Sequence, residues 1–340
     1  MSNRKNKDDD VINIIQKTII DNELILDNEK ILVALSGGPD SMCLLYSLLK
    51  IQEKLKNKIN FTIEAVHVHH MLRKESDAEE KDVEEYCKQN NVKLHIGKFD
   101  VKKIALEKKE SIETAARNVR YEFFDQVAEK TGANKIAVAH NLNDDAETII
   151  MHFIRGTSLN GLTGISYENR NIIRPLLNVT KEKVLEFCSY NNIKFAHDKT
   201  NDEQIYIRNK VRLDLIKKIE DEYNPNFISS VIRMKNILQE EELYLKEVSD
   251  KTLEKVIVST NINSIIFDRI KLNENNPAIV KRVLIALIQR VTGRLDGIEY
   301  IHINDVQRLI KTAVKGKKYI LGNKYTVEIV DKSYAKISKN

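Results

Sequence analysis

The feature that most constrains the fold is an alternation of short apolar runs and helical patterns over the first 200 residues. Apolar runs at 31–35, 61–68, 92–96 and 135–139 alternate with amphipathic segments at 42–49, 76–89, 112–128 and 144–154. This alternation predicts parallel strands joined by helices, and therefore a doubly wound, Rossmann-like α/β sheet with helices on both faces. In sheets of this class, ligands bind at the carboxyl ends of the strands.

The turn after the first apolar run lies at such a strand end and reads Ser36-Gly37-Gly38-Pro39-Asp40-Ser41. The helix that follows presents backbone N–H groups and the positive end of its dipole, which favour phosphate. The two glycines allow close approach of the backbone, and the hydroxyls of Ser36 and Ser41 can donate to the same oxygens. The turn is therefore predicted to bind phosphate.

Asp40 distinguishes this turn from a Walker-type loop, whose Gly-Lys-Ser/Thr ending is absent. A carboxylate inside a phosphate site is expected to hold a Mg²⁺ ion that neutralises the polyphosphate. The alternative is an ordinary helix start, in which Ser36 is the N-cap and Asp40 lies in the first turn. The complete strand–turn–helix context favours the phosphate site.

A second polar segment, 140–147, follows the fourth apolar run and opens a helix. Asp144 and Glu147 are three residues apart and share one helix face. Together with Asp40 they form a candidate magnesium site of oxygen ligands. A plain helix start, with Asn143 as its N-cap and acids in its first turn, also explains much of this segment.

Histidines and glycines also gather near these strand ends. His67 and His69 share one strand face, but no carboxylate or cysteine lies at ligand spacing, so we expect a structural or nucleotide-contacting role. For His140, local spacing supports equally a core or capping role and a functional one, as a phosphate contact or in proton transfer. The three glycines within 155–164 predict a long mobile loop over the site.

Several basic residues are candidates for phosphate or RNA contacts. Arg117 lies in a helical stripe, and Arg208 and Arg212 are four residues apart, a spacing that suits a phosphate clamp. A basic cluster near the end of the sequence comprises Arg308, Lys311, Lys315, Lys317, Lys318 and Lys324. An RNA backbone fits such a cluster. A solvated or ion-paired surface is the alternative for each of these groups.

The pattern changes after residue 220, which predicts two domains, 1–220 and 221–340. The second is expected to be smaller, mainly helical, and to end in a β-hairpin. Its predicted helices span 227–258, 278–292 and 305–313, and its predicted strands lie around Tyr319, at 325–330 and at 334–337.

Composition indicates an ordinary globular protein. The 340 residues are 42% hydrophobic and 31% charged, with a net charge of +5. No apolar run approaches a membrane span, and the polar start has no signal-peptide core. The cysteines Cys43, Cys87 and Cys188 form no C-x-x-C pair, which argues against a zinc site, an iron–sulfur site and a disulfide scaffold. A cytoplasmic protein is therefore expected.

Taken together, these segments resemble the tRNA(Ile)-lysidine synthetases, a family of N-type ATP pyrophosphatases with a PP-loop. The resemblance covers about residues 29 to 215, and the helical segment and hairpin of the second domain extend it. The resemblance implies that the further C-terminal domain of longer family members is missing, so more of the tRNA binding is expected of the second domain and the basic end. The segments that carry the resemblance are Ser36–Ser41, Val66–Arg73, Glu75–Asp77, Glu113–Tyr121, His140–Gly164, Arg174–Leu177, Asp198–Asn201 and Tyr206–Arg212.

The resemblance implies an ATP-dependent ligase that converts the wobble cytidine of a tRNA(Ile) with a CAU anticodon into lysidine. ATP adenylates the C2 carbonyl oxygen and releases pyrophosphate, and the ε-amino group of free L-lysine then attacks C2 and expels AMP. Activation comes first because AMP leaves readily and a carbonyl oxygen does not. The product anticodon reads AUA in place of AUG. No membrane partner is implied, and assembly as a homodimer is left open.

Roles are carried over by position. The resemblance implies ATP contacts for Ser36, Gly37, Gly38, Pro39, Asp40, Ser41, His67, Arg117 and His140, and Mg²⁺ ligands in Asp40 and Asp144. Its candidate catalytic residues are Asp40, His140, Asp144 and Arg208, and its candidate tRNA contacts are Arg212, Lys317 and Lys318. The lysine-binding residues are not assigned, nor is any contact of Asp145 or Glu147 with the metal.

Two alternatives are less well supported. A tRNA thiolase shares the adenylation step but delivers sulfur, usually through paired cysteines, which this sequence lacks. A non-catalytic RNA-binding protein with a degenerate nucleotide fold would not need the intact Ser-Gly-Gly-x-Asp-Ser turn or the acids Asp144 and Glu147.

Overall fold

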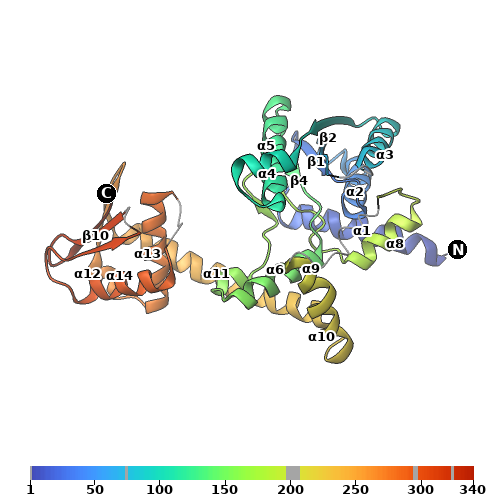
Figure 1. Cartoon of the computed structure of the whole chain (residues 1–340). Helices are drawn as coiled ribbons and strands as arrows, with labels where there is room; N and C mark the ends of the chain where they lie inside the picture. The colour runs from blue at the N-terminus through green and yellow to red at the C-terminus, as the bar shows by residue number, and fades with distance from the viewer. Residues whose placement is uncertain (1, 73–75, 197–206, 294–297, 323–324) are drawn as a thin grey trace. The chain divides into compact units, whose positions relative to one another are not determined.

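The chain forms two compact units, 1–236 and 237–340, each described here by itself. Their division falls within helix α11 (Phe227–Val256), later than the boundary expected near 220. None of the described helices is long and apolar enough to cross a membrane. The computed structural model describes residues 2–72, 76–196, 207–293, 298–322 and 325–340, without the side chains of residues 2–9 (Figure 1).

The described residues of the first unit form a six-stranded sheet with the strand order β3-β2-β1-β4-β6-β5. All neighbouring strands are parallel except β5 and β6. The order reverses between β1 and β4, which confirms the predicted doubly wound sheet and creates a crevice at the carboxyl ends of these two strands. The strands are β1 (Lys30–Leu35), β2 (Thr62–His69), β3 (Lys93–Lys98), β4 (Lys135–Ala137), β5 (Glu168–Asn169) and β6 (Ile172–Ile173).

Helices cover both faces of this sheet, with α4 and α5 on one side and α2 and α3 on the other (Figure 1). Alternating side chains of β1 fix these layers. Ile31 and Val33 belong to the core shared with α1, α2 and α8, whereas Leu32 packs in the core that contains Phe124 of α5. The helices are α1 (Ser2–Asp21), α2 (Pro39–Leu55), α3 (Ser76–Gln89), α4 (Val101–Lys108), α5 (Ile112–Thr131), α6 (Leu142–Arg155), α7 (Leu159–Leu162), α8 (Lys181–Tyr190), α9 (Ile207–Lys210) and α10 (Lys217–Glu222).

The second unit contains a five-stranded antiparallel sheet with the order β7-β8-β11-β10-β9 among its described residues. The predicted helices and terminal hairpin are present, but the sheet is larger than expected, because residues 257–268 form a hairpin. In its second strand Ile265 and Phe267 alternate with more exposed neighbours, a strand pattern that the sequence analysis missed. The elements are β7 (Ile257–Asn261), β8 (Ser264–Asp268), α12 (Arg269–Asn273), α13 (Pro277–Thr292), α14 (Tyr300–Thr312), β9 (Lys318–Leu321), β10 (Tyr325–Ile329) and β11 (Tyr334–Lys339).

A buried ion pair fixes the start of α11 to α6 within the first unit. Lys235 Nζ lies 2.6 Å from Asp145 Oδ2, and both side chains are almost fully buried. The other oxygen of Asp145 accepts a hydrogen bond from the backbone N–H of Ile165 at 2.6 Å. Gly164 has a φ of +71°, and a Cβ there would lie 2.2 Å from Asp145 Oδ1. Asp145 is therefore committed to the interior of the first unit.

This pair predicts a large stability effect. Replacement of Lys235 by Ala leaves a buried, uncompensated carboxylate, so we expect the free energy of unfolding to fall by about 3–5 kcal/mol. Urea denaturation followed by circular dichroism measures the change. The control is Lys251→Ala on the same helix, because Lys251 pairs with Glu247 at an exposed surface and its loss should leave the transition unchanged. Equal effects of the two substitutions would contradict the prediction.

Candidate active site

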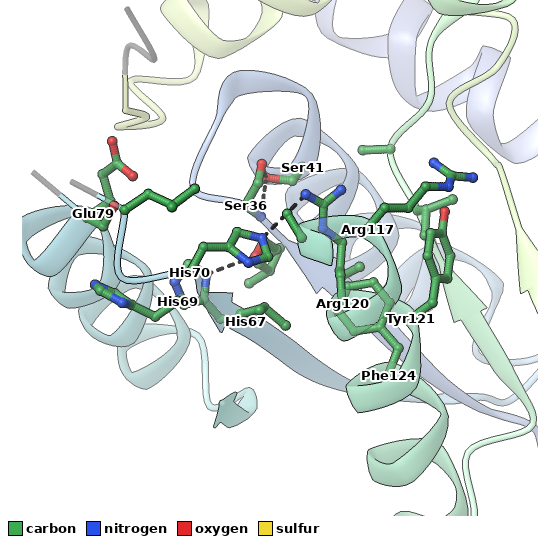
Figure 2. Close-up of a pocket in the computed structure, with 18 of the residues that line it drawn as sticks. Ser36, Ser41, His67, His69, His70, Glu79, Arg117, Arg120, Tyr121 and Phe124 are labelled. Carbon is green, nitrogen blue, oxygen red and sulfur yellow. Dashed lines mark hydrogen bonds between the residues drawn. The ribbon is translucent and has the colours of Figure 1, made fainter. Parts of the chain in front are cut away.

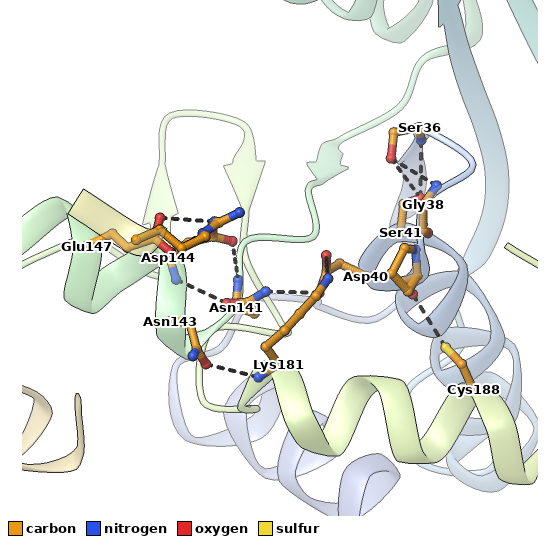
Figure 3. Close-up of polar contacts among 12 residues, drawn as sticks. Ser36, Gly38, Asp40, Ser41, Asn141, Asn143, Asp144, Glu147, Lys181 and Cys188 are labelled. Atoms are coloured by element: carbon orange, nitrogen blue, oxygen red, sulfur yellow. Dashed lines mark hydrogen bonds and ion pairs between the residues drawn. The ribbon is translucent and has the colours of Figure 1, made fainter. Parts of the chain in front are cut away.

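The predicted phosphate turn joins β1 to α2 at the carboxyl edge of the sheet. Gly37 has a φ of +81°, a conformation that favours glycine, and Pro39 is the first residue of α2, with Gly38 as the N-cap. The hydroxyl of Ser41 donates to the carbonyl of Gly38 at 3.0 Å and lies 3.2 Å from the hydroxyl of Ser36 (Figure 3). The strand–turn–helix context is confirmed, and two hydroxyls gather at a helix N-terminus.

A cleft of about 770 Å³ lies beside this turn (Figure 2). A volume of this size suits a ligand as large as a nucleotide. Its lining also contains residues to which the sequence assigned no role, including Arg120 and Tyr121. The predicted residues that it brings together are Ser36, Asp40, Ser41, His67, Arg117 and His140. Asp144, Arg208 and Arg212 are not among the described residues of this lining.

His67 and His70 enter the cleft from the end of β2. Nδ1 of His67 donates to the carbonyl of Leu35 at 2.9 Å, and burial lowers the pKa of His67. Arg120 lies 3.4 Å from Nε2 of His70 (Figure 2). Burial, with the nearby charge of Arg120, lowers the pKa of His70 to about 4. Both rings are therefore neutral at pH 7 and suit contacts to a nucleotide.

His140 follows β4 and is also neutral. Its Nδ1 accepts a hydrogen bond from Nε of Arg174 at 3.3 Å, and because arginine only donates, the ring proton is assigned to Nε2. The pKa of His140 is lowered to about 4, mainly by burial. The charge of Asp144 opposes this shift, and the charge of Arg174 adds to it. A neutral imidazole of this tautomer donates through Nε2. The geometry therefore favours a contact to an anionic oxygen over the proton-transfer role.

Asn141 links the two predicted metal ligands. Its Nδ2 donates to Asp40 Oδ1 at 2.9 Å, and its backbone N–H donates to Asp144 Oδ2 at 3.0 Å (Figure 3). Asn141 is the N-cap of α6, so the expectation of a cap at Asn143 is wrong. Helix α6 starts earlier because Asn141 and Asp144 form a reciprocal capping box. Oδ1 of Asn143 instead accepts from the backbone N–H of Lys181 at 2.9 Å.

The two carboxylates fit a magnesium site that is completed by substrate. Mg²⁺ is usually bound by one or two carboxylates, with phosphates and water as the other ligands. Asp40 and Asp144 offer hard oxygen atoms on either side of Asn141, and Asp40 belongs to the phosphate turn. The described residues contain no group of three or more His, Cys, Asp or Glu that could hold a metal.

Arg208 and Arg212 pair with acids of α6. Nε of Arg208 lies 2.9 Å from Glu147 Oε2, and Nε of Arg212 lies 2.5 Å from Glu147 Oε1. Both arginines also contact Asp144 Oδ1, at 3.2 and 3.1 Å. Glu147 is buried, so it needs these cations as counter-charges. The catalytic role of Arg208 and the tRNA contact of Arg212 stay predictions.

The cysteines all lie in packed positions. Cys43, Cys87 and Cys188 are at most 1% exposed. A hydrogen bond to Cys188 and burial raise the pKa of Cys43, and burial raises the pKa of Cys87 to about 12. These two thiols are therefore protonated at neutral pH, which suppresses nucleophilic chemistry.

The basic cluster lies in the second unit, where Lys317 and Lys318 are exposed at the start of β9. Lys318 Nζ is 3.3 Å from Glu328 Oε1, an exposed pair that holds it loosely. The predicted residues Arg73, Glu75, Asp198–Asn201, Tyr206 and Lys324 lie outside the described residues.

Comparison with known proteins identifies the family of the chain. Residues 9–219 match the PP-loop domain family, so the chain is a PP-loop protein. It is 38% identical to a tRNA(Ile)-lysidine synthase from Clostridium tetani, over 88% of this chain and 64% of the relative. It is 36% identical to the same enzyme from Clostridium perfringens, over 96% of this chain and 71% of the relative. The chain belongs to the tRNA(Ile)-lysidine synthase family and spans about two thirds of the length of these relatives.

A solved structure supports the fold alone. The U34-tRNA thiolase NcsA from Methanococcus maripaludis, solved with its 4Fe-4S cluster, superimposes with a TM-score of 0.57. The match covers 69% of this chain and 80% of that one, at 20% identity. At this identity the likeness confirms the architecture and carries no information about the reaction.

The environment of His140 predicts its titration. The pKa of this imidazole is about 4, against 6.5 for a free histidine, so the unfolded chain binds a proton between these values and the folded chain does not. Stability should therefore decrease as the pH falls from about 6.5 to about 4. Nuclear magnetic resonance of the imidazole should show the neutral Nε2–H form down to about pH 4. Arg174→Gln should raise this pKa, because a positive neighbour is lost. Titration of His140 near 6.5 in the folded protein would contradict the assignment.

Proposed function

We propose that the chain is an ATP-dependent ligase that joins free L-lysine to C2 of the wobble cytidine in a tRNA(Ile) with a CAU anticodon. The observation that carries the proposal is the meeting of the phosphate turn, Asp40 and His140 at one cleft, in a chain of the tRNA(Ile)-lysidine synthase family. Because its substrates are ATP, lysine and a tRNA, this reaction is expected to take place in the cytoplasm.

In the first step the C2 oxygen of cytidine attacks the α-phosphate of ATP, and the bond to the β-phosphate breaks. The turn from Ser36 to Ser41 would hold the departing pyrophosphate through hydroxyls and backbone N–H groups. His140 and Arg117 line the same cleft, and an imidazole N–H and a guanidinium suit donation to phosphate oxygens. When bound, Mg²⁺ would supply neutralising charge at the polyphosphate, with Asp40 and Asp144 as its protein ligands.

In the second step the ε-amino nitrogen of lysine attacks C2, and AMP leaves with the C2 oxygen. The protein contributes mainly by holding the amine and the adenylated base in line. Arg208 is the proposed residue beside the reacting base. Its pairing with Glu147 and Asp144 of α6 means that it acts as part of a charged cluster between α9 and α6, and not as an isolated cation.

The thiolase alternative receives less support from this chain. Sulfur delivery through the protein needs a reactive thiolate or a metal cluster. Cys43, Cys87 and Cys188 are buried, and two of them have a raised pKa. The likeness to NcsA concerns the fold alone and does not decide between the two reactions.

The decisive measurement is mass spectrometry of nucleosides from a CAU-anticodon tRNA(Ile) incubated with protein, ATP, Mg²⁺ and lysine. We expect lysidine and an equal amount of AMP. Asp40→Asn should lower the rate on the order of 10²-fold or more, because a charge near the phosphates is lost.

The control is a Cys43→Ser, Cys87→Ser, Cys188→Ser variant, which should retain lysine-dependent AMP release despite some loss of stability from buried hydroxyls. Sulfur in place of lysine on the cytidine would overturn the proposal in favour of a thiolase. Near-normal adenylation by Asp40→Asn at saturating Mg²⁺ would overturn the role of Asp40.

We also propose that the second unit binds the body of the tRNA through its basic cluster. Phosphate contacts supply most of the affinity of such complexes. Charge reversal at Lys317 and Lys318 should weaken tRNA binding about tenfold and reduce its salt dependence. The control reverses Lys251 and Lys255, two exposed lysines of α11, and so imposes the same change in net charge. Filter binding at several salt concentrations compares the two, and equal losses would contradict a localised contact.

A further inference from the structure

The carboxylate of Asp40 already has a cation beside it. Lys181 Nζ lies 2.5 Å from Asp40 Oδ2, and Asn141 Nδ2 lies 2.9 Å from Asp40 Oδ1 (Figure 3). Both oxygens of the acid in the phosphate turn are thus engaged by side chains from other parts of the chain. The two charged side chains are 33% and 25% exposed, so water and ions have access to this pair, and its acid, Asp40, lines the cleft.

The backbone of Lys181 is fixed from two directions. Its N–H donates to Asn143 Oδ1 at 2.9 Å, and the preceding Thr180 is the N-cap of α8. Helix α8 also packs in the same core as α2, which carries Asp40. The backbone of Lys181 is therefore fixed, while its four-carbon side chain is flexible. The ammonium can thus exchange one partner for another nearby.

This arrangement supplies what the turn itself lacks. A Walker-type loop carries its own lysine for the phosphates, whereas this turn has Asp40 at that end and no lysine. Helix α8 brings a lysine to the same place from a distant part of the chain. A divalent cation that uses Asp40 must displace the ammonium from Oδ2, because the two positive groups would otherwise repel at close range.

We propose that Lys181 is a positioning residue that neutralises Asp40 until Mg²⁺ and the triphosphate arrive, and that its displaced ammonium then pairs with a phosphate oxygen. Lys181 thus weakens metal binding to the nucleotide-free protein and strengthens binding of the metal–nucleotide complex. The inference rests on the proposed function only in that ATP and a divalent cation bind at this turn.

The test uses the whole chain and two binding measurements. Electron paramagnetic resonance of free Mn²⁺ gives the affinity of the nucleotide-free protein for the metal, and isothermal titration calorimetry gives the affinity for ATP at saturating Mg²⁺. Lys181→Gln should tighten Mn²⁺ binding about fivefold, as expected for loss of a half-exposed competing ion pair. The same variant should weaken ATP binding by a similar factor. Adding Asp40→Asn to Lys181→Gln should abolish the gain in Mn²⁺ affinity.

The matched control is Lys183→Gln, two residues along the same helix, where the lysine pairs with exposed Asp10. It should change neither affinity. A purely structural role for Lys181 would lower both affinities. Unchanged Mn²⁺ binding would mean that Lys181 does not compete with the metal for Asp40. Either result overturns the inference. Tighter Mn²⁺ binding with unchanged ATP binding would overturn the phosphate contact. These assays contain no tRNA or lysine, so their outcome is distinguishable from a failure of the proposed ligase reaction.

Discussion

The parallel pairing of β1 with β4 is the constraint on which the site depends. Ile31, Leu32 and Val33 are in register with Lys135, Ile136 and Ala137, so the two strands end at one edge of the sheet. The turn that begins at Ser36 and the segment that begins at His140 thereby become neighbours, although about a hundred residues separate them. The hydrogen bond from Asn141 to Asp40 is a direct consequence of this register.

The second constraint on the site is that its acidic side chains are paired with cations. Asp40 is paired with Lys181, Asp144 with two arginines, and Glu147 with the same two arginines. Each of these three acids therefore has a cationic partner from α8 or from the helical segment 207–222. Substrate phosphates would enter a site whose acids are already neutralised, so they would meet nearby cations that can change partners.

The elements of the first unit could be predicted because their signals are local. Apolar alternation and the Ser36–Ser41 turn each lie within a few residues, and they identified β1, α2 and the carboxyl edge. The resemblance then placed His67, Arg117 and His140 at one cleft, where the structure also has them. The hairpin at 257–268 was missed because its pattern is short and follows a long helix without a break.

The partners of the site residues could not be predicted, because they depend on contacts between distant segments. Nothing near Asp40 in the sequence indicates Lys181, and nothing near His140 indicates Arg174. The sequence placed Glu147, but not Asp145, on the helix face of Asp144; in the structure Asp145 pairs with the buried Lys235 and Glu147 with two arginines. The sequence shows that Asp145 and Glu147 lie on different faces of the helix, but it does not show which cations pair with each acid.

The Asp145–Lys235 pair has a consequence for how the chain acquires its fold during synthesis. The acid is made ninety residues before its cation, so a nascent chain that ends anywhere before residue 235 must keep Asp145 hydrated, protonated or exposed. The core around α6 can close only when the first turns of α11 have left the ribosome. The match to the PP-loop domain family ends at residue 219, whereas the unit that buries Asp145 together with its counter-charge extends to Lys235.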